Sequence, residues 1–414
     1  MKITGIIAEY NPFHNGHAYQ IEQAKKNGAD YIIIVMSGNF LQRGTPAILD
    51  KWTRAKMALS AGADLIIELP AVFATASAQY FARGGVSILD KLGCVDTISF
   101  GCESNDIHMI HELSSFLWKE PDSYKEKLQT FLKKGNSFPK ARELALSSEL
   151  SPEVATFASS PNNILALEYS IALLERGSNM NILPIERKGS GYHMDQIKAG
   201  TLPSATAIRK VLQSNNNIDC MNSSIDSLSD YVPKTVSSII KEQAINCIYQ
   251  DDFSLLLKYK LLSQGNSSFA EYADVSEDLS DKIHKNLRYY RDYTQFCELL
   301  KSKELTYSRI NRALTHILLN ITQDMYEDIK TNDYAAYERI LGFKKSSKEV
   351  LSNIGKNNKI PLITKLTHAT ELLDSKSMLY LEHDIFCSHV YNSVVFQKTL
   401  EEVQNEYQKQ IVIL

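Results

Sequence analysis

Short apolar runs alternate with helix-like segments over the first half of the chain. Five runs rich in β-branched residues have the length and continuity of buried strands in a parallel sheet. They cover residues 3–8, 30–36, 63–70, 95–100 and 180–185. Between them, apolar residues recur at three- and four-residue spacing, which predicts helices at 17–26 and 50–58. This alternation predicts an α/β fold with a doubly wound, mostly parallel sheet.

Glycine and proline divide the chain into two parts. Fifteen of the 18 glycines and nine of the 11 prolines lie at or before Pro203. The first part therefore has many turns, as alternating strands and helices require, and we expect helices beyond Asp230. A stretch rich in Ser, Asn and Asp at 214–230 is the candidate linker. We accordingly predict a catalytic domain at 1–213 and a mainly helical region at 231–414.

Composition excludes some classes of protein. The chain has 48 acidic and 45 basic residues, so it is not basic throughout, although a local basic patch remains possible. Six cysteines show no metal-binding spacing, so we expect reduced thiols, a cytoplasmic protein and no zinc site. We expect no signal peptide, and no apolar run reaches the ~18 residues of a membrane span.

The polar stretch at residues 9–17 lies where the first strand passes into the first helix. Ligands bind at this edge of open α/β sheets, and a helix N-terminus favours an anion. Gly16 would let the backbone approach a nucleotide, and His14 and His17 could both donate to phosphate oxygens. The stretch therefore predicts a phosphate site. The alternative is a capped turn with two hydrogen-bonded histidines.

Further candidates follow other predicted strands or begin helices. Gly101 ends the fourth strand, where it makes room for a nucleoside or simply forms a turn. Asn162 can bind a ligand or cap its helix. Arg187 follows the fifth strand. Among residues 204–209, hydroxyl groups and a helix N-terminus would hold phosphates while Arg209 neutralises charge, although a capping box would also explain the hydroxyls.

Two groups of basic residues remain. Arg43, Lys51 and Arg54 follow the second strand, where they would be available to phosphates or a carboxylate substrate, or would form a solvated basic loop. In the second half, basic residues are interleaved with tyrosines, as on RNA-binding surfaces. A solvated helical face fits that pattern equally well. The candidates for RNA contact are Lys282, Lys285, Arg288, Arg291, Arg309 and Arg312.

These motifs resemble those of a known family. The sequence HNGH at 14–17 resembles the HxGH motif of nucleotidyltransferases, which have a Rossmann-like fold. The longer run EYNPFHNGH at 9–17 resembles the bacterial tRNA(Met) cytidine acetate ligases, as do RGTPAI at 43–48 and SPNN at 160–163. SATAIR at 204–209 resembles the second motif of the superfamily, with Ala205 in place of its usual serine. The resemblance spans nearly the full length.

The resemblance implies a Rossmann-like nucleotidyltransferase domain followed by a mainly α-helical region. It also implies catalytic roles for His14 and His17, and a set of ATP-binding residues. The expected ATP-binding residues are Ile7, Ala8, Glu9, Tyr10, Asn11, Pro12, Phe13, His14, Asn15, Gly16, His17, Ala18, Tyr19, Gln20, Gly101, Asn162, Arg187, Ser204, Thr206 and Arg209.

The implied reaction joins acetate to RNA. Acetate and ATP would give acetyl-adenylate, and the acetyl group would pass to N4 of the wobble cytidine of elongator tRNA(Met). A carboxylate is already ionised at neutral pH, so its attack on phosphate requires no strong general base. The two histidines would stabilise charge developing on the phosphate. We expect Mg²⁺ with ATP, although no carboxylate cluster identifies its ligands.

Two other functions use the same motifs. A small-molecule adenylyltransferase of coenzyme biosynthesis would share the HxGH core, but would leave the long helical region without a purpose. A non-catalytic, ATP-dependent RNA-binding protein would use the histidines only to hold ATP. The residues identify no acetate pocket, and they leave the oligomeric state open.

Overall fold

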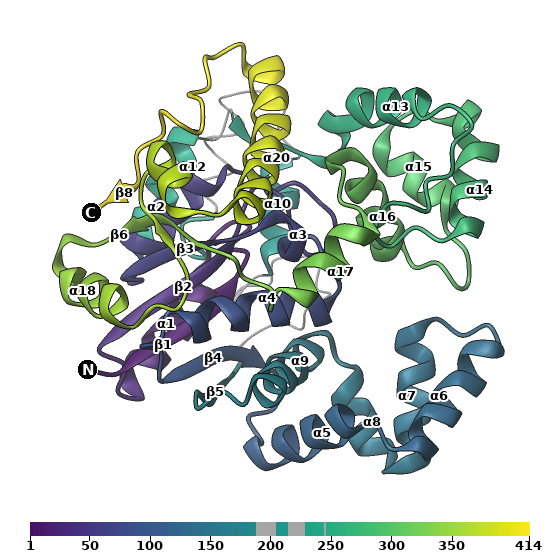
Figure 1. Cartoon of the computed structure of the whole chain (residues 1–414), viewed down its shortest axis with the longest axis horizontal. Helices are drawn as coiled ribbons and strands as arrows, with labels where there is room; N and C mark the ends of the chain where they lie inside the picture. Colours follow the sequence, from purple (N-terminus) through teal and green to yellow (C-terminus); the bar gives the residue numbers. More distant parts are fainter. Residues whose placement is uncertain (188–203, 214–227, 244–245) are drawn as a thin grey trace.

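The computed structural model describes residues 1–187, 204–213, 228–243 and 246–414. Its centre is an eight-stranded sheet in the order β5-β4-β1-β2-β3-β6-β7, with β8 beside β6 (Figure 1). The first five strands are parallel. They are β1 (Ile3–Ala8), β2 (Tyr31–Ser37), β3 (Leu65–Leu69), β4 (Thr97–Cys102) and β5 (Asn181–Glu186). The predicted doubly wound sheet is confirmed.

The strand order reverses at β1. From β1 the chain adds β2 and β3 on one side, then crosses to add β4 and β5 on the other. Ile6 of β1 accordingly lies between Ile34 of β2 and Ser99 of β4. In open α/β sheets, ligands bind at the carboxyl ends of the strands that flank such a reversal.

Helices cover both faces of the sheet because side chains alternate along each strand. Ile6 and Ile34 pack with one set of helices, and Ile7 and Val35 pack with the other. The first set is α1 (Asn15–Lys26), α2 (Lys51–Ser60), α10 (Ala205–Gln213) and α12 (Lys234–Gln243). The second set includes α3 (Ala71–Ala74), α4 (Ala78–Lys91) and α9 (Pro161–Arg176).

Two helical lobes extend from the same side of the sheet in Figure 1. The lower lobe has its own apolar cluster, which includes Leu113, Tyr124 and Leu146. It consists of α5 (Ile107–Lys119), α6 (Asp122–Lys133), α7 (Phe138–Glu149) and α8 (Pro152–Ser159). The upper lobe consists of α13 (Ser254–Ser263), α14 (Glu277–Asn286), α15 (Tyr293–Leu300), α16 (Tyr307–Leu319) and α17 (Gln323–Thr331).

The chain then returns to the sheet, so the expectation of helices beyond residue 230 is wrong at three places. These are β6 (Glu338–Phe343), β7 (Leu362–Ile363) and β8 (Val412–Ile413). β6 pairs antiparallel with β3 and buries Ile340 and Leu341 on opposite faces of the sheet. A short run that is apolar on both sides fits a buried strand better than an amphipathic helix.

The remaining helices of this part are α18 (Lys348–Asn357), α19 (Ala369–Leu372) and α20 (Ser375–Thr399). The division into 1–213 and 231–414 stays a prediction, and residues 214–227 of the candidate linker lie outside the described residues. Among the helices of the described part, none is long and apolar enough to cross a membrane.

Candidate active site

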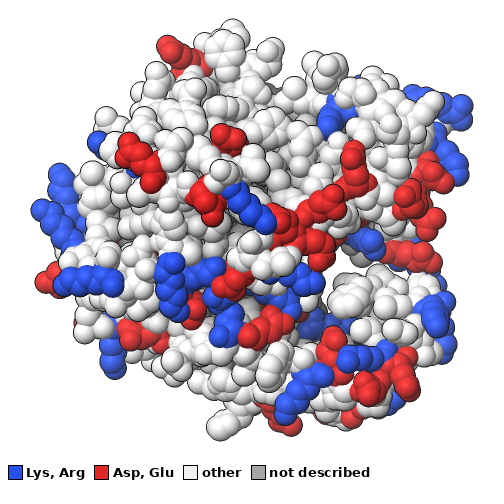
Figure 2. All heavy atoms as spheres, in the orientation of Figure 1, with Lys and Arg blue, Asp and Glu red and all other residues white. Residues whose placement is uncertain are grey.

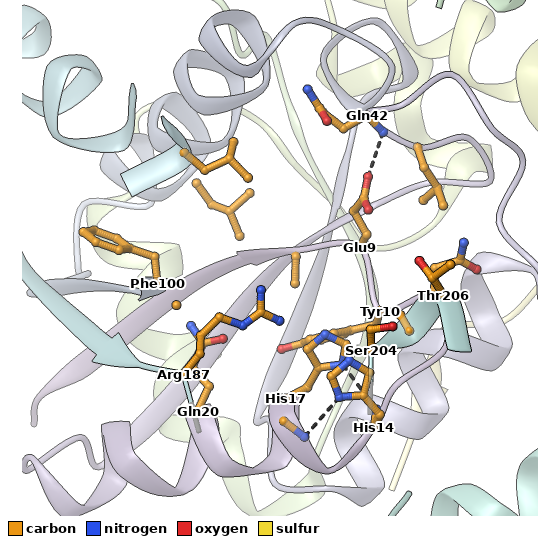
Figure 3. A pocket seen from close by; sticks show the side chains of 18 of the residues that line it. Glu9, Tyr10, His14, His17, Gln20, Gln42, Phe100, Arg187, Ser204 and Thr206 are labelled. Atoms are coloured by element: carbon orange, nitrogen blue, oxygen red, sulfur yellow. Dashed lines mark hydrogen bonds between the residues drawn. The ribbon is translucent and has the colours of Figure 1, made fainter. Parts of the chain in front are cut away.

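A cavity of about 270 Å³ opens at the carboxyl ends of β1, β4 and β5 (Figure 3). Most of the residues predicted from the motifs line it. They are Ile7, Ala8, Glu9, Tyr10, Asn11, His14, Gly16, His17, Tyr19, Gln20, Gly101, Arg187, Ser204, Thr206 and Arg209. The strand reversal thus places the motifs of distant segments around one space.

Local hydrogen bonds fix the two histidines at the start of α1. His14 is the N-cap, and its Nδ1 accepts a hydrogen bond from the Gly16 amide at 3.0 Å. His17 Nδ1 accepts one from the His14 amide at 3.2 Å. The rings stack with their centroids 3.7 Å apart. Because each Nδ1 is an acceptor, each neutral ring carries its proton on Nε2, where it can donate to a ligand.

Both imidazoles are neutral at physiological pH. Burial lowers the pKa of His14 to about 3, with smaller contributions from the charges of Arg187 and Arg209. Burial also lowers the pKa of His17 well below its usual value, assisted by His14 and Arg187. The histidines therefore offer N–H donors without positive charge. Positive charge at the cavity comes instead from the two arginines and the helix N-termini.

Gly16 is required by the position of the His14 ring. A Cβ atom at residue 16 would lie 2.8 Å from His14 Cε1 and 3.0 Å from its Nδ1. Asn15 points elsewhere, because its side chain donates to the Asp230 carbonyl at 2.9 Å. Phe13 is buried beneath the ring of His17. The members of the predicted set that do not line the cavity are Pro12, Phe13, Asn15 and Ala18.

The start of α10 forms the wall beside the histidines. Arg209 donates from Nη1 to the Asn11 carbonyl at 2.7 Å and from Nη2 to Thr206 Oγ1 at 3.1 Å. Ser204 Oγ accepts a hydrogen bond from the Ala207 amide at 3.2 Å, so it caps the helix. These contacts join the second motif to the first and bring the N-termini of α1 and α10 to one cavity.

The opposite wall comes from β4, β5 and α9. At Gly101 a Cβ atom would meet Arg187 Cγ at 3.6 Å, an ordinary contact, so the protein itself tolerates a side chain there. The side chain of Asn162 lies outside the described residues. Its neighbour Asn163 holds the loop after β4, because its Oδ1 accepts from the Glu103 amide at 3.0 Å.

Two cations expected at the ligand edge are instead buried, so that expectation is wrong for Lys51 and Arg54. Arg54 donates to the carbonyl oxygens of Leu49 and Glu9, at 2.9 and 2.6 Å. Lys51 pairs with Glu68 at 2.7 Å. Arg43, by contrast, is exposed and lines the cavity.

Sequence reasoning missed several residues of the cavity wall, all of them uncharged except Glu186. These residues can be recognised as part of the cavity only from their position in the folded structure, since apolar and polar residues of this kind occur throughout the chain. The loop after β2 is the exception, because its basic residues mark it in the sequence. The missed residues are Leu41, Gln42, Thr45, Phe81, Phe100, Leu165, Tyr169, Ile185, Glu186 and Ala205.

The six candidates for tRNA contact lie on or beside α14 and α16 of the upper lobe. Figure 2 shows Lys and Arg at the outer rim of this lobe, with Asp and Glu between them. Lys282 donates to the carbonyl of Lys301 at 3.1 Å, and Arg312 pairs with Asp274 at 2.8 Å. The four whose side chains are exposed are Lys285, Arg288, Arg291 and Arg309.

The fold and the cavity are those of a nucleotidyl transferase. The model of the HIGH Nucleotidyl Transferase family matches residues 1–408. A tRNA(Met) cytidine acetate ligase of Thermoanaerobacter pseudethanolicus is 40% identical over 396 residues, covering 94% of this chain and 95% of the relative. That of Acetivibrio thermocellus is 38% identical over 420 residues, covering both chains completely.

Solved structures agree with these relatives. The crystal structure of apo Thermotoga maritima TmcAL superimposes with a TM-score of 0.91 at 32% identity, and its complex with alpha-thio ATP with a TM-score of 0.89 at 31% identity. Each comparison covers all of both chains. The chain therefore belongs to the HIGH nucleotidyl transferase family and, within it, to the tRNA(Met) cytidine acetate ligases.

Proposed function

We propose that this protein is an ATP-dependent ligase that joins acetate to a cytidine of tRNA(Met). The observation that carries this proposal is the cavity itself, where two neutral imidazoles, two arginines and two helix N-termini surround one space. Such a set binds a polyphosphate. A relative at 31% identity has been solved with alpha-thio ATP, and the relatives carry the ligase name over the full length.

In the first step, an acetate oxygen attacks the α-phosphate of ATP and pyrophosphate leaves. His14 and His17 donate Nε2–H bonds to the phosphoryl oxygens, whose charge grows during attack. Arg187 and Arg209 offset that charge, and the product is acetyl-adenylate. We expect Mg²⁺ to enter with ATP, because a triphosphate binds this ion.

In the second step, the acetyl group passes to N4 of the wobble cytidine of elongator tRNA(Met) and gives N4-acetylcytidine. An exocyclic amine of cytosine is a poor nucleophile, which is why the acyl group must first be activated. The four exposed cations on or beside α14 and α16, with Tyr289 exposed beside Arg288, would contact the RNA. A tRNA substrate places the reaction in the cytoplasm.

One assay separates this function from its rivals. Purified protein is incubated with ATP, labelled acetate and total tRNA, and the RNA is digested to nucleosides. We expect label in N4-acetylcytidine, and none when ATP is omitted. An adenylyltransferase of small molecules would leave the tRNA unlabelled and form a different adenylated product. A non-catalytic RNA-binding protein would consume no ATP.

The variant His14→Ala tests whether adenylate formation belongs to the cavity and tRNA binding to the upper lobe. It should lose acetyl-adenylate formation by about 10²-fold or more, because a donor to the developing charge is removed. It should retain tRNA affinity in a filter-binding assay. Loss of tRNA binding with intact adenylate formation would contradict the assignment of this residue to the ATP site.

A further inference from the structure

Beyond the phosphate-binding groups, the cavity contains a carboxylate and a phenol of different chemistry. Glu9 and Tyr169 both line it, and the Tyr169 ring packs against Phe100 with centroids 5.7 Å apart. In Figure 3 the Glu9 side chain points toward the backbone of Gln42 and away from the two imidazoles. A carboxylate repels triphosphate and acetate, because both are anions. This part of the cavity suits a neutral hydrogen-bond donor.

Glu9 is held firmly with one oxygen available. Its Oε1 accepts a hydrogen bond from the Gln42 amide at 2.7 Å, and its carbonyl accepts from Arg54 Nη1 at 2.6 Å. Its Oε2 accepts no hydrogen bond from the residues that the structure describes. The carboxylate is thus fixed in direction before any substrate arrives, as a general base must be.

Tyr169 supplies a donor to the same cavity. The side chain lies on α9 and is 3% exposed, and its hydroxyl has no hydrogen-bond partner among the described residues. Burial, and then the negative charge of Glu9, raise the pKa of this phenol, so it stays protonated at neutral pH. A carboxylate and an O–H donor in one cavity match acyl transfer, in which an amine loses a proton while a carbonyl oxygen gains negative charge.

We propose that Glu9 is the general base of the transfer step and that Tyr169 donates to the acetyl oxygen. The assignment rests on the proposed ligase function. Cytosine N4 attacks the carbonyl carbon of acetyl-adenylate, so a C–N bond forms and the bond from that carbon to the phosphate oxygen breaks. Its electron pair leaves with AMP. The N4 proton passes to Glu9 Oε2 and then to solvent. Glutamate accepting from N4 is also a common way of recognising cytosine.

The variant Glu9→Gln tests the base. Glutamine keeps an oxygen for the Gln42 amide but cannot take a proton at neutral pH. We expect labelled acetyl-adenylate to form within several-fold of the wild-type rate, whereas transfer to tRNA falls by about 10²–10⁴-fold. Acetyl-adenylate should therefore accumulate on the enzyme. Glu22→Gln, on the exposed part of α1, is the matched control and should leave both steps unchanged.

The variant Tyr169→Phe tests the donor and removes only an oxygen without a partner. It should slow transfer by about 10²-fold and spare adenylate formation. It also keeps the proposal testable if Glu9→Gln lowers the thermal midpoint. Filter binding of tRNA should be unchanged in both variants, since neither residue contacts the phosphate backbone.

Two results would overturn this assignment. Equal loss of both steps in Glu9→Gln would mean that the carboxylate serves ATP, and transfer at the wild-type rate would mean that it only holds the loop after β2. Failure of the ligase function looks different, because the wild-type protein itself would then label no tRNA.

Discussion

Replacing Glu406 with glutamine should destabilise the whole protein, although this residue of the C-terminal segment does not line the cavity. Its carboxylate is 1% exposed and pairs with Lys51 at 3.0 Å and with Arg339 at 2.6 Å. Glu68 pairs with the same two cations, so two positive charges meet two negative ones. Removing one carboxylate leaves Glu68 to share two buried cations, so one positive charge is no longer compensated.

The size of the effect follows from the pKa of Glu406. Burial alone would raise this pKa, but the charges of Lys51 and Arg339 overcome burial and lower it from 4.5 to about 2. A difference of this size corresponds to ~3 kcal/mol between the ionised and neutral forms. Loss of one partner from a buried ion pair costs a similar amount, about 3–5 kcal/mol. We therefore expect Glu406→Gln to lower the free energy of unfolding by about 3 kcal/mol at pH 7.

Urea unfolding followed by tryptophan fluorescence measures this loss. Trp52 Nε1 lies 3.4 Å from Glu406 Oε1, and the second tryptophan, Trp118, can be replaced by phenylalanine. Glu402→Gln, an exposed change in the same segment, should stay within about 0.5 kcal/mol of the parent protein. Equal unfolding free energies for the two variants would refute the reasoning.

The pH dependence gives an independent check. The pKa of Glu406 is lower in the folded than in the unfolded protein, so its contribution is complete above about pH 5 and lost as the pH falls toward 2. The difference between parent and Glu406→Gln should therefore shrink on acidification. A difference that stays constant down to about pH 3 would assign the cost to packing rather than to charge.

Other predictions concern the cavity and the RNA. Gly16→Ala should displace His14 and slow adenylate formation at least about 10-fold, as measured by single-turnover kinetics. Gly101→Ala should leave the thermal midpoint unchanged, since the added methyl group meets only ordinary contacts within the protein. It should raise the KM for ATP, because residue 101 lines the cavity. Because the pKa of His14 is about 3, adenylate formation should show no loss from its protonation between roughly pH 6 and 8. Replacing Lys285 and Arg288 with alanine should weaken tRNA binding and make its salt dependence shallower, with adenylate formation intact.

Local patterns in the sequence were enough to locate the site. Continuous apolar runs define the parallel strands, and the carboxyl ends of such strands meet at one edge of the sheet. His14, Gly101 and Arg187 each follow a strand, so their meeting at one cavity could be foreseen. The resemblance of residues 9–17 to a known family then indicated the chemistry, which the comparisons over the full length support.

Tertiary contacts determined the burial of Lys51 and Arg54 and the secondary structure of the C-terminal segments. Lys51 looks like a ligand-binding residue in the sequence, because its burial depends on partners such as Glu406 that lie far along the chain. Arg54 is buried instead against nearer backbone carbonyls, those of Leu49 and Glu9 among them. Residues 338–343 form a strand because β3 offers an unpaired edge. The placing of Tyr169 near Glu9 likewise comes from packing of α9 on the sheet. Sequence alone thus determined the candidate nucleotide site through local pattern, whereas burial and pairing between distant segments were decided only by the folded structure.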